Sequence, residues 1–350
     1  MTRALSARTA LCLALSALAA LAAAAAPPTA PPVEAPTKPV PGEGVFVAVG
    51  YGGFRGWSLD GMEWSAERWS DKNADDPNII FSLTYRAGIF LCAGGGVGKG
   101  FILRSVDGRH WDEVAHTRWR IASVVTLPDR FLSVYDDHFQ ASPDGLTWQA
   151  LAEAHAVAGD GKGSGYFRRA AVGNGAAVFA GDYALPDGKP RIGWLGGTKN
   201  GETAMAVTTI GADCCGLAFG GGRFLACSAG GEMLSSSDGL RFTPLPPSND
   251  RHEDDCLRFH DGVFSLRGKT GVRTSPDGMA WTPLLNPPRL AHAQAPNRVA
   301  IDCSWGGIVV AHDGTTFTKA HVPVDATGVC AVAWGIPLAN LPPAAKAKKP

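Results

Sequence analysis

Residues 58–64 read Ser-Leu-Asp-Gly-Met-Glu-Trp, and the pattern Ser-x-Asp-Gly-x-x-Trp within them recurs along the chain. Five further copies place their Asp-Gly pairs at 107–108, 144–145, 238–239, 277–278 and 313–314, with Phe for Trp in two copies and Ala for Ser in one. The steps between the Asp residues are 47, 37, 94, 39 and 36 residues. The double-length step contains Thr198-Lys199-Asn200-Gly201, a degenerate copy. The chain therefore carries seven repeats with a period of about 40 residues.

Each copy has the chemistry of a β-hairpin turn. The Ser ends one strand, Asp-Gly supplies a turn in which Gly takes a positive φ, and the aromatic residue begins the return strand. The Asp carboxylate can accept backbone N–H bonds from its own turn. We therefore expect a structural and not a catalytic role for the Asp residues of the six clear copies, which are Asp60, Asp107, Asp144, Asp238, Asp277 and Asp313.

Other strands precede each repeat. A turn followed by an apolar strand comes first, as in Gly88-Ile89-Phe90-Leu91, and a further strand such as 79–85 precedes that. Four antiparallel strands per period are typical of a propeller blade, because one such sheet must bury its faces against neighbouring sheets. The chain starts at a second strand, 45–49, and finishes with an unpartnered strand, 329–335. We predict an all-β, seven-bladed β-propeller that closes when the C-terminal strand completes the first blade.

The composition limits the classes of partner. Lys+Arg and Asp+Glu both number 32, so the chain offers no electrostatic reason to expect a nucleic acid or an anionic membrane. The 44 Gly and 25 Pro residues are typical of a turn-rich β protein and unfavourable for long helices.

The termini differ from the body in composition. Residues 1–26 have a basic start and a short Ala/Leu-rich apolar run, which predicts a signal peptide, with a retained anchor as the alternative. Residues 27–42 form a Pro-rich linker, 43–335 the propeller, and 336–350 a tail of Pro, Ala and Lys. We expect export across the inner membrane to the periplasm, cell envelope or exterior. After removal of the signal we expect a monomer without a membrane span.

The Ser-x-Asp-Gly-x-x-Trp copies resemble the Asp-box, or BNR, repeat of the sialidase-like β-propeller superfamily, and they are also similar to the photosystem II assembly-factor type of propeller. The resemblance covers nearly the whole mature chain and implies the propeller fold. In that superfamily the repeat is a turn element placed away from the binding mouth. The resemblance leaves function open, because the superfamily contains both enzymes and assembly factors.

The catalytic residues of a sialidase are not recognisable in this chain. Such an enzyme needs three converging arginines, a tyrosine nucleophile with its glutamate, and an aspartate as acid and base. The nearest matches to its first arginine motif, 85–88 and 190–193, depart from it. We therefore predict a secreted, non-enzymatic platform that binds or assembles a protein or glycan. The alternative is a divergent glycan hydrolase or lyase with an arginine and carboxylate site at the channel mouth, and a purely structural role in the envelope is a third possibility.

The loops that enter the innermost strands form the mouth of a propeller, and ligands commonly bind there. Aligning the inner strands on Tyr85, Phe219, Phe259 and Trp334 places a set of charged side chains at this mouth. The set consists of Arg118, Arg120, Arg168, Arg169, Asp213, Asp254 and Asp255. Two basic blades facing two acidic ones would suit a polar or zwitterionic ligand. The alternative is a solvated rim whose charges pair with one another.

The cysteines fit an exported protein. Seven remain after loss of Cys12, and their spacing matches no zinc motif. The run 252–255 (His-Glu-Asp-Asp) alternates between the two faces of a strand, so we expect neither a metal site nor a cofactor. Cys214, Cys215 and Cys256 fall at similar heights on neighbouring inner strands. This predicts a disulfide between two blades, with a vicinal Cys214–Cys215 bond as the alternative.

Overall fold

The computed structural model describes residues 42–70, 77–96, 98–135, 138–151, 164–184, 192–201, 206–211, 213–253, 255–285, 289 and 291–342. The predicted signal peptide, nearly all of the linker and the last eight residues of the tail lie outside this part. Within it, no helix has the length and apolar character that crossing a membrane requires.

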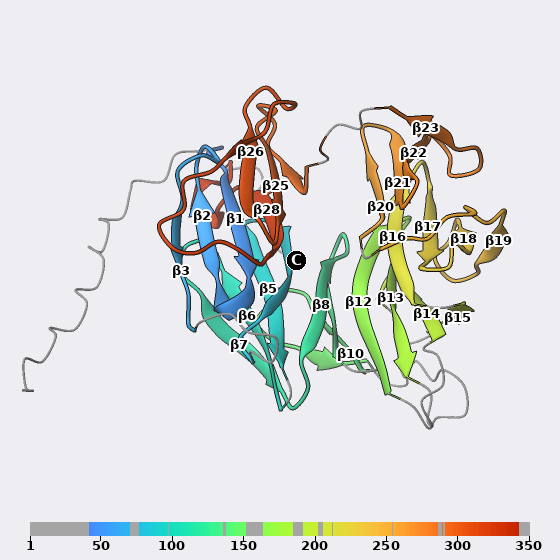
Figure 1. Cartoon of the computed structure of the whole chain (residues 1–350). Coiled ribbons are helices and arrows are strands. Elements are labelled where there is room, and N and C mark those ends of the chain that lie inside the picture. Colours follow the sequence, from blue (N-terminus) through green and yellow to red (C-terminus); the bar gives the residue numbers. More distant parts are fainter. Residues whose placement is uncertain are drawn as a thin grey trace, which may run out of the picture. The chain divides into compact units, whose positions relative to one another are not determined.

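The described chain forms seven four-stranded antiparallel sheets, so the predicted seven-bladed propeller is confirmed (Figure 1). Blade 1 contains β28 (Val329–Gly335), β1 (Val45–Gly50), β2 (Arg55–Ser58) and β3 (Ser65–Glu67). Blade 2 contains β4 (Ile80–Arg86), β5 (Ile89–Gly96), β6 (Lys99–Ser105) and β7 (Asp112–Thr117). Blade 3 contains β8 (Ile121–Thr126), β9 (Phe131–Tyr135), β10 (His138–Ser142) and β11 (Gln149–Ala150).

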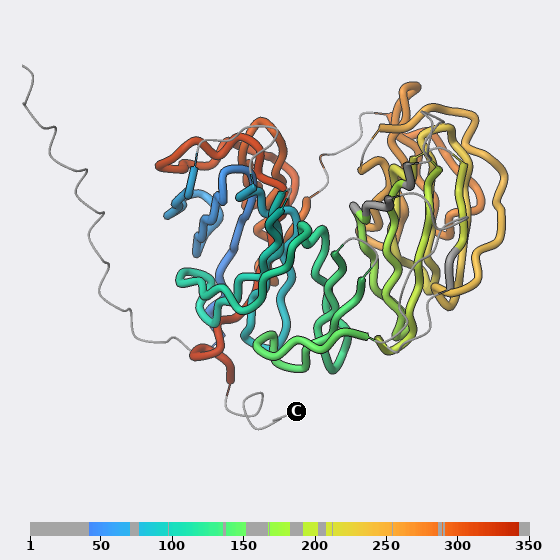
Figure 2. Tube along the Cα trace, turned by 90° about the horizontal axis from the view of Figure 1, so that it is seen from below, coloured from blue at the N-terminus to red at the C-terminus, as the bar shows by residue number. Residues whose placement is uncertain are grey.

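The remaining four blades follow in sequence order, as the colours show (Figure 2). Blade 4 contains β12 (Ser164–Gly173), β13 (Ala176–Ala184), β14 (Ile192–Lys199) and β15 (Ala206–Ile210). Blade 5 contains β16 (Cys214–Gly220), β17 (Arg223–Ser228), β18 (Met233–Ser236) and β19 (Thr243–Leu245). Blade 6 contains β20 (Leu257–His260), β21 (Val263–Gly268), β22 (Gly271–Ser275) and β23 (Thr282–Leu284). Blade 7 contains β24 (Ala293–Gln294), β25 (Ala300–Ser304), β26 (Gly307–Ala311) and β27 (Thr318–Lys319).

The two ends of the chain meet in blade 1. The C-terminal strand β28 pairs with β1, with Val47 opposite Ala333, so the predicted closing strand is confirmed. Blade 7 also contacts blade 1 through an isolated bridge between Glu63 and His321. Beyond β28, a 3-10 turn (η3, Leu338–Asn340) remains attached, because the Leu338 N–H donates to the Val106 carbonyl at 2.9 Å.

The repeats form the turn between the third and fourth strands of each blade. In the five copies that begin with Ser, the Ser hydroxyl accepts a hydrogen bond from the Gly N–H at 2.8–2.9 Å. The Asp carboxylate accepts N–H bonds from residues further along the turn, for example from Leu146 to Asp144 at 2.9 Å. In blade 1 the Trp64 indole N–H donates to the Gly61 carbonyl at 2.7 Å. The Ser and Asp side chains of the repeat therefore bond within the turn itself, and in blade 1 the Trp does so too.

The Gly of each turn also connects neighbouring blades. Its φ is positive, between 67° and 82° across the seven copies. A Cβ on Gly145 of blade 3 would lie 3.0 Å from Leu91 of blade 2, and one on Gly278 of blade 6 would lie 2.2 Å from Leu225 of blade 5. The corresponding Gly residues of blades 1, 2, 4 and 5 likewise face side chains of the preceding blade. Only a residue without a side chain lets the turn approach its neighbour this closely.

The turn of blade 7 is different. A Cβ on Gly314 would meet only the carbonyl oxygen of Arg298, 3.5 Å away and in the same blade. The buried apolar clusters also connect neighbouring blades. They join blade 7 to 1, 1 to 2, 2 to 3, 3 to 4, 4 to 5 and 5 to 6. Among the described residues, none of these clusters spans blades 6 and 7.

We predict that Gly278→Ala destabilises the protein more than Gly314→Ala does. The two positions have φ values of 76° and 77°, so the backbone strain of an Ala is the same at both. Only the new methyl at 278 collides with Leu225, and such overpacking costs about 1–3 kcal/mol more. Thermal midpoints of the two variants test this. Equal midpoints would show that the turn of blade 6 does not hold blade 5.

The turn carboxylates should also make stability depend on pH. Hydrogen bonds, led by that from the Leu146 N–H, hold the pKa of Asp144 below its ordinary value. The stabilisation is therefore complete above the unfolded pKa of about 4 and disappears as the pH falls through the lower folded pKa.

We expect Asp144→Asn, which retains a carbonyl acceptor but never ionises, to lose less stability than wild type between pH 5 and pH 2. Thermal melts across that range make the comparison. Asp112→Asn, on the exposed face of β7, is the matched control and should follow wild type. An unchanged acid response in Asp144→Asn would exclude this contribution.

Candidate functional site

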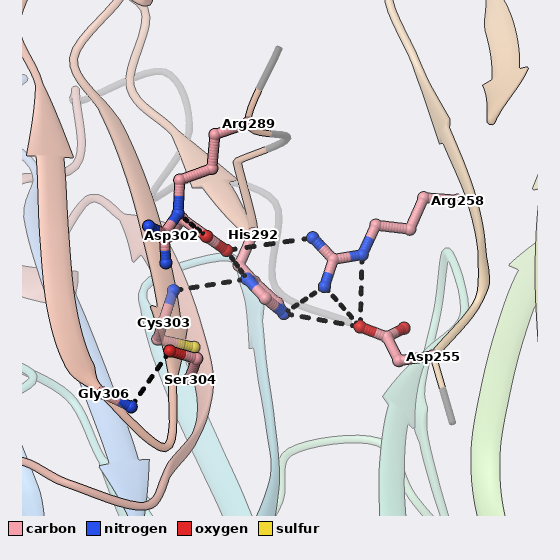
Figure 3. Close-up of polar contacts among 8 residues, drawn as sticks. All are labelled: Asp255, Arg258, Arg289, His292, Asp302, Cys303, Ser304 and Gly306. Carbon is pink, nitrogen blue, oxygen red and sulfur yellow. Dashed lines mark hydrogen bonds and ion pairs between the residues drawn. The ribbon is translucent and has the colours of Figure 1, made fainter. Parts of the chain in front are cut away.

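Charged side chains join blades 6 and 7, at the junction that no apolar cluster of the described residues spans (Figure 3). Arg258 lies on β20, the innermost strand of blade 6, and Asp255 lies just before it. His292 lies just before β24 of blade 7, and Asp302 lies on the neighbouring strand β25. Arg289 precedes His292. We call these five residues the junction cluster.

Asp302 anchors the blade 7 half of the cluster. Its side chain is only 10% exposed, and it accepts hydrogen bonds from His292 Nδ1 at 2.5 Å and from Arg289 Nε. Burial alone would raise the pKa of Asp302, but the bonds from His292 and Arg289 outweigh it and the pKa lies below its ordinary value. Asp302 is thus the carboxylate that positions the imidazole and one guanidinium.

Arg258 connects the two halves. Its Nη2 lies 3.0 Å from His292 Nε2, and its Nη1 lies 3.8 Å from an oxygen of Asp302. When the Nδ1–H of His292 donates to Asp302, Nε2 carries the lone pair that accepts a hydrogen bond from Arg258. The contacts on both ring nitrogens therefore select one tautomer of His292.

Asp255 pairs with Arg258 from the solvent side. Its Oδ2 accepts from Arg258 Nε at 3.2 Å and from Nη2, while its side chain stays 54% exposed. The backbone at Asp255 is left-handed, with φ of 61°, and its N–H donates to the Cys215 carbonyl of blade 5 at 2.9 Å. An exposed ion pair of this kind contributes little free energy, so Asp255 binds Arg258 only weakly.

The other predicted mouth residues have separate surroundings. Arg118 is exposed beside Trp119, and the Arg120 guanidinium lies 5.4 Å from the centre of the Phe81 ring. Arg169 donates to the Cys214 carbonyl at 2.9 Å. Asp213 is half-buried, and its own carbonyl accepts the Ala229 N–H. Asp254 and the side chain of Arg168 lie outside the described part.

Asp255 belongs to the junction cluster, but sequence analysis did not find its partners. Arg258 and Asp302 lie within strands and not in the loops that enter the innermost strands. His292 lies in a segment without a recognisable motif. Thirty-four residues separate Arg258 from His292 along the chain. The sequence does hold one signal for Arg258 and Asp302, since each is a charged residue between two apolar residues of a strand. A charged side chain in such a position needs a partner.

The inner strands of blades 2, 3 and 4 enclose a second feature, a hollow of about 320 Å³ lined by β4, β8 and β12. Its polar side chains bond between the blades. Ser82 Oγ donates to the Val124 carbonyl at 3.1 Å, and the Thr84 and Thr126 hydroxyls lie 2.8 Å apart. These groups hold inner strands together, so the junction cluster is the stronger candidate site.

Solved structures of other proteins show a likeness to this chain. No family model matches the sequence, and no curated protein matches it either. A structure of YCF48 bound to a D1 peptide is 16% identical, with a TM-score of 0.48, over 69% of this chain and 77% of that one. BamB from Moraxella catarrhalis is 12% identical, with a TM-score of 0.45, over 78% and 81%. A chain of a mitotic checkpoint complex is 12% identical, with a TM-score of 0.49, over 95% and 92%. At these values no conclusion about function rests on them.

We predict that Asp302→Asn destabilises the protein by about 2 kcal/mol or more, because it removes the charge that Arg289 and His292 share in a buried position. Asp255→Asn removes an exposed charge and should cost less than about 1 kcal/mol. Asn tolerates the left-handed backbone at 255, so strain does not enter the comparison. Thermal midpoints at pH 7 measure both effects. If the two variants melt together, Asp302 is not the anchor of the cluster.

Proposed function

We propose that this protein is an exported, non-enzymatic propeller that binds a protein partner. The junction of blades 6 and 7 binds a carboxylate group that belongs to this partner. The observation that carries the proposal is the Arg258 guanidinium, held between His292 and the exposed Asp255. A guanidinium presents a planar fork of N–H donors that matches a carboxylate. Asp255 already pairs with this guanidinium, and this supports a carboxylate as the ligand.

A partner carboxylate would replace Asp255 on Arg258. Since the Asp255 pair is exposed, releasing it costs little free energy. The junction cluster would then hold two guanidinium groups, His292 and the single carboxylate of Asp302, a set with excess positive charge. Such a site favours an acidic side chain or the C-terminus of a protein partner.

An array of peptides with Glu or Gln at matched positions, and with free or amidated C-termini, tests the proposal. We expect binding only where a carboxylate is present. Arg258→Ala should lower the affinity about tenfold or more, since a charge pair is lost. Asp255→Asn should raise it, because the internal competitor is weakened. Arg241→Ala, an exposed arginine in the turn of blade 5, is the control and should bind as wild type does. Binding that is insensitive to Arg258 and Asp255 would refute the site.

A glycan-acting hydrolase or lyase is the second candidate. The favouring observation is the His292–Asp302 pair at 2.5 Å beside Arg258, since a carboxylate-oriented imidazole can move a proton while an arginine neutralises a substrate carboxylate. Incubating the protein with uronate- and sialate-containing oligosaccharides decides between the two. Chain cleavage that disappears in His292→Ala would replace the platform by an enzyme.

Export and kinship with the Asp-box propellers are parts of the same proposal. The basic and apolar pattern of residues 1–26 supports the first, and the shared turn geometry of the repeats supports the second. Mass spectrometry of the mature N-terminus after cell fractionation tests export. A full-length protein in the cytosolic fraction would contradict it.

A further inference from the structure

Three thiols converge between blades 5 and 6, away from the junction cluster side of β20. Cys215 lies on β16 and Cys227 on β17 of blade 5, while Cys256 immediately precedes β20 of blade 6. Their sulfur atoms all lie within 4.8 Å of one another, and those of Cys215 and Cys256 are 3.3 Å apart and not bonded. Cys214, Cys215 and Cys256 are all free thiols, so neither the predicted disulfide between blades nor its vicinal alternative is formed. All three residues are buried, with exposed fractions of 1%, 0% and 4%.

The backbone aims these thiols at one another. The pairing of β16 with β17 shifts register between Cys214 and Gly216, which makes Cys215 the extra residue of a β-bulge. A bulge turns a side chain away from the direction that regular alternation would give it. The Cys215 carbonyl in turn accepts the N–H bonds that fix the approach of Asp255 and Cys256. The three sulfurs are therefore positioned by hydrogen-bonded backbone from both blades.

We propose that Cys215, Cys227 and Cys256 form a binding site for one Cu(I) ion. Three sulfur atoms about 2.3 Å from a shared ion lie about 4 Å apart. The three sulfurs lie within 4.8 Å of one another, and those of Cys215 and Cys256, now 3.3 Å apart, would separate slightly on binding the ion. Thiolates are soft ligands that favour Cu(I) and Zn²⁺ among the common metal ions.

The number of donors separates these two metals. Structural Zn²⁺ takes four ligands. Among the described residues, no His, Asp or Glu joins the three cysteines as a possible ligand. His252, four residues before Cys256, has its Nε2 2.6 Å from Ser248 Oγ and its Nδ1 2.7 Å from the Arg267 carbonyl. A buried three-sulfur site therefore suits Cu(I), which accepts lower coordination.

The charge of the complex has a partial counterion. Each thiol that becomes a ligand releases its proton to solvent, and the copper remains Cu(I) throughout, so three thiolates and one Cu(I) carry a charge of −2. The guanidinium of Arg169, which bonds the adjacent Cys214 carbonyl, acts electrostatically on both Cys215 and Cys256. The bound ion would also tie blade 6 to blade 5 and stabilise that junction.

The test titrates the full chain, kept reduced and free of oxygen, with Cu(I) supplied from a chromogenic chelator of known affinity. We expect one Cu(I) per protein, an ultraviolet thiolate-to-copper absorption band, and a higher thermal midpoint. Cys227→Ala should weaken Cu(I) binding at least tenfold. Cys92→Ala is the matched control, because Cys92 is also 0% exposed and lies on the second strand of its blade, and it should bind as wild type does.

A second measurement keeps the proposal testable if Cys227→Ala does not fold. Wild-type protein is alkylated under partial denaturation with and without Cu(I), and the modified peptides are mapped. Protection confined to Cys215, Cys227 and Cys256 supports the site. No uptake of Cu(I), protection spread evenly over all cysteines, or displacement of Cu(I) by equimolar Zn²⁺ would overturn it. So would a reduced protein that binds no copper and instead forms a Cys215–Cys256 disulfide on exposure to air.

Discussion

The contact that six of the seven repeat turns make with the preceding blade is the constraint on which the propeller depends. The turn combines three properties: a Ser and an Asp that satisfy its own N–H groups, a Gly with positive φ, and the absence of a Cβ at the point of contact. The Asp-Gly pair thus serves both the hairpin and the interface between blades. This dual use accounts for a repeat that keeps Gly in all seven copies and Asp in six, while the other positions vary more.

At the junction between blades 6 and 7, the described residues do not make that contact. At Gly314 the turn meets its own blade, and polar side chains make the connection that apolar packing makes elsewhere. Asp255, Arg258 and His292 at this junction remain partly exposed to solvent, whereas tightly packed apolar side chains would exclude it. Blade 6 therefore has two unlike neighbours, with three thiols facing blade 5 and charged groups facing blade 7. Asp255 and Cys256, adjacent in sequence, belong to one set each.

The blades could be predicted from the sequence because each is specified locally. The period of the repeats, the turn chemistry and the apolar strands together identify the four strands of a blade, and the unpaired strands at the two ends identify the closure at β1 and β28. The inner-strand alignment was also useful, since Phe219 and Phe259 lie at equivalent positions, each against a Gly of the preceding blade. Local patterns of this kind can be recognised in the sequence without knowledge of the fold.

The candidate site could not be predicted in the same way, because it depends on contacts between blades. Arg258, His292 and Asp302 carry no shared motif, and the bulge that turns Cys215 toward Cys227 and Cys256 is not encoded by residue type. The number of blades, their turns and the closing strand follow from the repeat pattern, since these need only hydrogen bonds and packing within one repeat or between equivalent repeats. Which charges and which thiols meet depends instead on how two non-equivalent blades face each other, so this could be seen only in the folded molecule.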